Sequence, residues 1–175
     1  MLKTLALARP PDTGTSESVQ REAARARRMA FLCLLPSNAA DIETTARALG
    51  DPDPQVRRLA VSSASASRET LARGLKDPSW LVRYEALLRY GRRFQAAEGC
   101  APIVGAVGAT ADHVSLLAVD LLGNACRPED RAVETLLDLA AGQDDADWRL
   151  RAHAIVALAK AAPERGRPML ARFLA

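Results

Sequence analysis

Few side chains in this sequence have the type and spacing that catalysis or metal binding requires. The histidines His113 and His153 stand on different predicted helices, without the His-Glu-x-x-His or Cys–His spacing of a zinc site. The cysteines Cys33, Cys100 and Cys126 lack Cys-x-x-Cys spacing, and no nucleotide-binding glycine loop or Gly-x-Ser-x-Gly motif occurs. We therefore expect a protein that is not an enzyme, with no metal, no cofactor and reduced, buried thiols.

The two tryptophans could serve either packing or binding. Trp80 and Trp148 occupy the first turn of their predicted helices, and Tyr84 follows Trp80 by about one helical turn. A large amphipathic ring in that position can shield the junction between two helices, or anchor a partner where it is exposed. The sequence leaves both roles open.

Two arginine-rich stretches raise the question of nucleic acid. The stretches 25–28 and 89–93 each carry three arginines, which could meet phosphates. A solvated helix face, or a helix C-terminus that favours positive charge, is the alternative. The net charge is +3, yet acidic groups outnumber basic ones between residues 95 and 142, so we expect no continuous basic track along the chain.

The elements that position these side chains are indicated by an internal repeat. Segment 51–60 reads DPDPQVRRLA and segment 77–86 reads DPSWLVRYEA, so both keep Asp-Pro, then Val-Arg, then Ala. Segment 145–154, DADWRLRAHA, is a third copy with Leu-Arg, and 114–118, VSLLA, keeps only the apolar spacing. The sequence therefore predicts four copies of one structural unit.

Each copy has the marks of a helical hairpin. Aspartate accepts bonds from the free N–H groups at a helix start, proline is tolerated in the first turn, and the apolar residues recur at helical spacing. Second helices are predicted at 55–66, 79–93, 111–125 and 146–161, first helices at 42–49, 68–75, 102–107 and 131–141, and further helices at 17–35 and 163–174. Ten helices, or about five hairpins, would form one all-α domain over 1–175, with an irregular segment at 1–16.

The repeated motif resembles the HEAT-repeat family, particularly its short bacterial, PBS-lyase-type form, over about residues 37–162. The resemblance implies an armadillo-like α-α superhelix whose second helices line the concave face. It also implies a ladder of arginines that pair with the aspartates of the turns, while Ser115 interrupts it. The ladder residues are Arg57, Arg83 and Arg151 with Asp51, Asp77 and Asp145, where Asp53 and Asp147 are alternatives to the first and last aspartates.

Stacked repeats create an extended binding surface, so we expect a scaffold or interaction module that grips a protein or peptide. The N-terminal apolar patch is too short for a signal peptide, and no apolar run is long enough for a membrane helix. A cytoplasmic protein that does not enter membranes is the corresponding prediction. Its partner-binding candidates are Arg58, Trp80, Tyr84, Arg149 and His153.

Other hypotheses remain open beside protein binding. One is nucleic-acid binding through the arginine-rich helices, and another is a role as accessory subunit of a lyase-type enzyme, which only the family resemblance suggests. The chain could also be an arm of a larger polypeptide, because the predicted helix at 163–174 has no partner after it. An apolar face on a terminal helix could instead join two copies in a homodimer.

Overall fold

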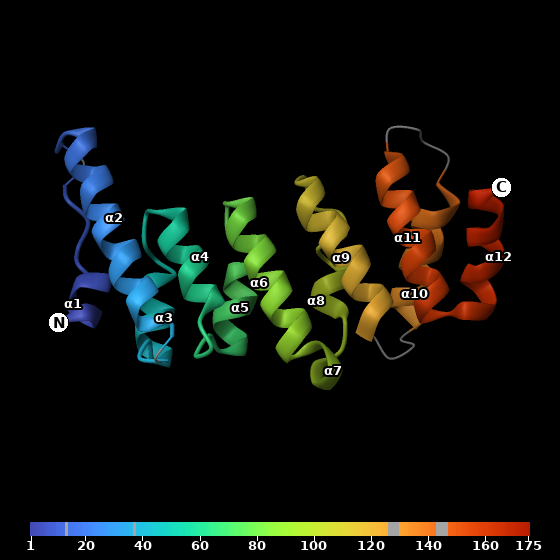
Figure 1. Ribbon diagram of the computed structural model, residues 1–175, viewed down its shortest axis with the longest axis horizontal. Coiled ribbons are helices and arrows are strands. Elements are labelled where there is room, and N and C mark those ends of the chain that lie inside the picture. The colour runs from blue at the N-terminus through green and yellow to red at the C-terminus, as the bar shows by residue number, and fades with distance from the viewer. Residues whose placement is uncertain (13, 37, 126–129, 143–146) are drawn as a thin grey trace. The chain divides into compact units, whose positions relative to one another are not determined.

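The computed structural model describes residues 1–12, 14–36, 38–125, 130–142 and 147–175 (Figure 1). Across these ranges the chain forms twelve helices and no strand. The predicted all-α fold class of consecutive helical hairpins is thereby confirmed. The chain separates into an N-terminal unit, Met1–Arg89, and a C-terminal unit, Tyr90–Ala175. One domain over 1–175 stays a prediction.

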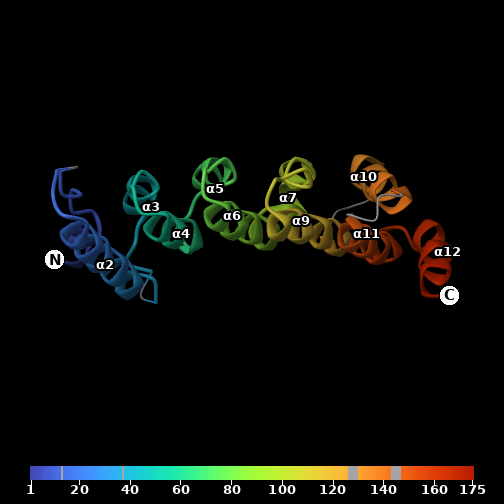
Figure 2. The same ribbon diagram turned by 90° about the horizontal axis from the view of Figure 1, so that it is seen from above.

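The N-terminal unit consists of two layers of helices. Figure 2 shows α3 and α5 on one side of this unit and α2 and α4 on the other. The side chains of Phe31, Val56, Val61 and Leu71 are fully buried in its core. Its elements are α1 (Leu2–Ala6), α2 (Glu17–Leu34), α3 (Ile42–Ala48), α4 (Pro54–Ser62), α5 (Arg68–Gly74) and the greater part of α6 (Trp80–Arg93).

Side-chain caps explain where the helices of the N-terminal unit begin. Asp41 accepts a bond from the Thr44 N–H at 2.8 Å before α3, and Ser67 accepts one from the Thr70 N–H at 3.1 Å before α5. Asp53 caps α4, where Pro54 takes the first helical position. Each cap satisfies a donor that has no partner inside the helix, which is why the Asp-Pro and Ser signals mark these starts.

The C-terminal unit repeats the two-layer arrangement. Figure 2 shows α7 and α10 on one side of this unit and α9 and α11 on the other, and α11 packs directly against α9, α10 and α12. Ile103, Leu122, Leu136 and Leu158 are fully buried. The elements are α7 (Gln95–Glu98), α8 (Ala101–Val104), α9 (Asp112–Ala125), α10 (Asp130–Ala141), α11 (Trp148–Ala161) and α12 (Pro163–Leu174).

Two glycines allow helices of the C-terminal unit to approach closely. A Cβ at Gly123 of α9 would lie 2.7 Å from the Cα of Ala157 in α11, and one at Gly166 of α12 would collide with the backbone of Ala159. Real Cβ atoms do not tolerate such distances, so these positions need glycine. Backbone contact at these points holds α9, α11 and α12 together.

Four details differ from the sequence prediction. The segment 1–16 contains α1. The helix expected at 102–107 is shortened to α8, and the unpredicted helix α7 precedes it, so the described residues hold more than ten helices. The helix α4 ends at Ser62, because the Ser63 side chain accepts a bond from the Ser65 N–H and competes with helix continuation.

The cysteines also differ from the expectation of buried, reduced thiols. Cys33 is a free thiol but is exposed, and Cys100 is buried but disulfide-bonded, so the expectation is wrong for both. Cys126 lies outside the described residues.

None of the described helices has the length and apolar composition needed to cross a membrane.

Candidate functional site

Arginine–aspartate ion pairs cross-link the helices of the N-terminal unit. Arg57 donates from Nε and Nη2 to the carboxylate of Asp77, at 2.8 and 2.9 Å, and from Nη1 to the carbonyl oxygens of Asp51 and Pro52, at 2.8 and 3.1 Å. The ladder register therefore differs from the expected one. Arg57 binds the backbone of its own turn, whereas its carboxylate partner belongs to the next repeat.

Burial and hydrogen bonding act in opposite directions on the acid of this pair. Burial alone would raise the pKa of Asp77, but bonds from the Arg57 guanidinium and the Ser79 N–H outweigh it and hold that pKa below its ordinary value. The bond to Asp77 correspondingly raises the pKa of Arg57. Both groups are therefore charged near neutral pH, and their pair joins two successive turns.

A preceding rung of the ladder comes from Arg27, which belongs to the arginine-rich stretch 25–28. Its Nε and Nη2 donate to Asp51 at 2.7 and 3.1 Å, and the two side chains are only 3% and 8% exposed. The sequence held a signal for this role, because Arg27 stands at helical spacing between the buried residues Ala24 and Phe31. A single arginine in an apolar stripe indicates a buried ion pair.

Arg83 repeats only half of this pattern. Its Nη1 donates to the carbonyl oxygens of Asp77 and Pro78 at 2.8 and 2.9 Å, as Arg57 does one repeat earlier. Among the described residues, no carboxylate forms an ion pair with Arg83.

The ladder is reduced further in the C-terminal unit. Ser115 stands at the arginine position and donates from Oγ to the carbonyl oxygen of Ala109 at 2.8 Å. Arg151 donates to the carbonyl oxygen of Gly142 at 3.1 Å, and its guanidinium carbon lies 5.9 Å from the ring centroid of Phe173. Asp145, one expected partner of Arg151, lies outside the described residues, and among the described residues no ion pair joins Arg151 to the alternative partner, Asp147.

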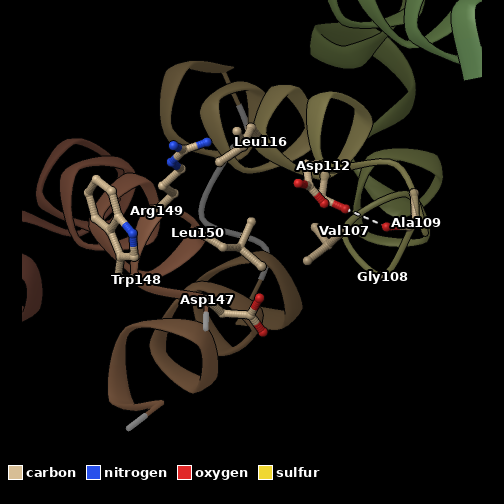
Figure 3. A pocket seen from close by; sticks show the side chains of 10 residues that line it. Val107, Gly108, Ala109, Asp112, Leu116, Asp147, Trp148, Arg149 and Leu150 are labelled. Carbon is tan, nitrogen blue, oxygen red and sulfur yellow. Dashed lines mark hydrogen bonds between the residues drawn. The ribbon is translucent and has the colours of Figure 1, made fainter. Parts of the chain in front are cut away.

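A pocket of about 360 Å³ opens where the Asp and Arg of the repeat are replaced by Ala109 and Ser115 (Figure 3). It lies in the C-terminal unit, between the turn before α9 and the N-terminal ends of α9 and α11. The small side chains of Ala109 and Ser115 leave unfilled the space that an aspartate and an arginine would take. The lining residues are Val107, Gly108, Ala109, Asp112, Ser115, Leu116, Asp147, Trp148, Arg149 and Leu150.

An aromatic and a cationic side chain stand together at this pocket. Trp148 is 54% exposed, and the Arg149 guanidinium carbon lies 5.5 Å from the centroid of its ring. Arg149 extends from α11 towards Leu116 of α9 (Figure 3). A tryptophan left in water beside a cavity retains most of its apolar area for contact with a ligand. For Trp148 the sequence had left the role of a partner anchor open, whereas Asp112 was not among the predicted binding residues.

The other predicted binding residues are placed differently. Arg58 donates from Nε to Gln55 Oε1 at 3.1 Å and lies 3.8 Å from a Glu85 oxygen, so its charge is engaged within the chain. Trp80 is 46% exposed and Tyr84 half-buried. In the C-terminal unit, His153 Nδ1 lies 2.8 Å from an oxygen of Asp120. The five candidates thus belong to two units, and only Arg149 lines the pocket.

The arginine-rich stretches carry less available charge than their sequence indicated. Arg27 and Arg28 pair with Asp51 and Asp53, and Arg89 donates to Glu85 at 2.7 Å. A guanidinium that already binds a carboxylate has few donors left for a phosphate. The stretch 25–28 is therefore largely structural.

No model of a protein family matches the chain, and no match is found among curated proteins.

Proposed function

We propose that the chain is a non-enzymatic interaction module that binds a protein or peptide segment at the pocket between α9 and α11. The observation that carries the proposal is the exposed Trp148 ring, with Arg149 over it, at the edge of a 360 Å³ cavity. Tryptophan and arginine are the side chains most often found at the energetic centres of protein interfaces. A pocket beside them gives a partner side chain a place to be buried.

The lining of the pocket indicates which peptide chemistry it fits. Val107, Leu116 and Leu150 provide apolar contacts for one aliphatic or aromatic side chain. The carboxylates of Asp112 and Asp147 can accept bonds from peptide N–H groups or from a basic side chain. The proposed ligand is therefore an extended or helical segment with an apolar anchor next to donor groups.

The HEAT resemblance is part of the same proposal. What supports it is one bond that recurs along the chain: the side chain at the ladder position donates to the carbonyl oxygen six residues earlier. This bond links Arg57 to Asp51, Arg83 to Asp77 and Ser115 to Ala109. Assignment to the HEAT family and a scaffold role rest on this motif and on the sequence pattern. A cytoplasmic location rests on the sequence alone, and the disulfide-bonded Cys100 argues against it.

The proposal is tested by selecting peptides that bind the full chain from a displayed random library. The affinity of each selected, labelled peptide is then measured for the wild type and for variants. Trp148→Ala should weaken binding about tenfold or more, as expected for the loss of a central aromatic contact. Val156→Ala is the matched control, because Val156 is an exposed apolar residue of the same helix but does not line the pocket. It should leave affinity unchanged within about twofold, an energy difference well below that of a hot spot.

Two outcomes would contradict the proposal. One is equal affinity of the selected peptides for the wild type and for Trp148→Ala. The other is failure to enrich any peptide while a labelled DNA duplex or single-stranded RNA binds with a steep salt dependence. That second result would instead favour the nucleic-acid hypothesis, because phosphate contacts release counterions.

A further inference from the structure

The N-terminal unit contains three arginines that can be compared as parts of one ladder. Arg27 and Arg57 each present a planar edge, formed by Nε and Nη2, to the two oxygens of an aspartate. Two parallel N–H donors match the two oxygens of a carboxylate, so this edge is its preferred binding site. In both rungs an aspartate of the chain fills that site.

Arg83 is held in the same way as Arg57 but lacks the aspartate. In each residue Nη1 donates to the carbonyl oxygens six and five positions earlier, with distances that agree within 0.2 Å. These bonds fix the guanidinium, and the Nε and Nη2 edge of Arg83 has no bonded partner in the part of the chain that the structure describes.

We propose that the Nε and Nη2 edge of Arg83 is a binding site for a carboxylate supplied by a peptide partner. Ordering a flexible arginine side chain usually opposes binding, but here the two backbone carbonyls have already ordered it. The neighbourhood favours a peptide source, since Trp80 stands one turn before Arg83 on α6 and is 46% exposed. This site lies in the N-terminal unit and does not depend on the Trp148 pocket.

The carboxylate could come from an aspartate or glutamate side chain or from a peptide C-terminus. Three probes separate these sources: N-acetyl-aspartate N-methylamide carries a side-chain carboxylate, N-acetylalanine carries a terminal one, and N-acetyl-asparagine N-methylamide carries none. Each is titrated into the full chain while the arginine Nε–H signals are followed by nuclear magnetic resonance. The probe with the lower midpoint identifies the source.

For a carboxylate probe, the Arg83 Nε–H signal should move and saturate at a concentration about tenfold or more below that of Arg92, an exposed arginine on the same helix. The Arg57 signal should not move, because its edge is filled by Asp77. Arg83→Lys, which keeps the charge but not the fork, should abolish the saturable response of neighbouring amides. The proposal fails if Arg83 titrates like Arg92, or if the asparagine probe produces the same shift.

Discussion

The two units contain the same repeat but stabilise it by different means. In the N-terminal unit, Arg27–Asp51 and Arg57–Asp77 tie successive helices through half-buried or buried ion pairs. In the C-terminal unit, Ser115 stands at the arginine position, and close contact at Gly123 and Gly166 joins the helices instead. Loss of a charged cross-link therefore need not loosen a repeat when backbones can approach directly. The same loss leaves the pocket beside Ala109 and Ser115.

The largest effect on stability is expected from breaking the buried Arg27–Asp51 ion pair of the N-terminal unit. Arg27→Ala leaves Asp51 nearly buried without its counter-charge, which should lower the free energy of unfolding by about 3–5 kcal/mol. Chemical denaturation measures this loss. The exposed Arg25→Ala control should change stability by less than about 0.5 kcal/mol. Equal losses of stability in the two variants would show that the ion pair does not cross-link α2 to the turn before α4.

A smaller loss of stability is expected from disturbing the close packing of helices in the C-terminal unit. Gly123→Ala places a methyl group against the Ala157 backbone and should destabilise the chain by about 1–3 kcal/mol through overpacking. Gly108→Ala is the control, since a Cβ there meets nothing within 4 Å. Amide hydrogen exchange should report faster opening of α9 and α11 in the first variant alone. Unchanged exchange rates in α9 and α11 of Gly123→Ala would contradict the claim that close packing stabilises the C-terminal unit.

The ion pair of the N-terminal unit predicts a pH dependence of stability. The pKa of Asp77 is lower in the folded chain than in the unfolded chain, so the unfolded state binds more protons as the pH falls. The stabilisation is fully present above the ordinary aspartate pKa of about 3.9 and is lost as the pH falls through the lower, folded value. Denaturation midpoints between pH 6 and pH 2 should therefore decline less steeply in Asp77→Asn than in the wild type. Parallel curves for the two proteins would contradict this assignment.

The smallest effect on stability is expected at the pocket itself. Trp148→Ala removes an exposed ring and should shift the free energy of unfolding by less than about 0.5–1 kcal/mol, while it weakens peptide binding. A thermal melt beside the peptide titration separates these two consequences. If stability falls by several kcal/mol, Trp148 shields a helix junction, which is the packing role that the sequence also allowed.

Helix positions were predictable because they depend on local signals. The apolar spacing placed α3, α5, α9 and α12 within a few residues of their observed bounds, and the Asp-Pro pairs marked the starts of α4 and α6. The register of the ladder was not predictable in this way. Whether the Arg57 guanidinium binds the carboxylate of Asp51 or of Asp77 depends on how closely one hairpin stacks on the next. A sequence pattern does not specify that stacking distance. The loss of the arginine at Ser115 was visible in the sequence, but the pocket was not, because the sequence does not show whether neighbouring helices close the space that the missing side chains leave.

Amide hydrogen exchange of the full chain, with and without a selected peptide, tests binding at the pocket most directly. Protection should concentrate in the turn at 107–109 and in the first turns of α9 and α11, around Asp112 and Trp148. The arginine stretches 25–28 and 89–93 should be unaffected. Protection confined to those stretches, or spread evenly over both units, would contradict binding between α9 and α11.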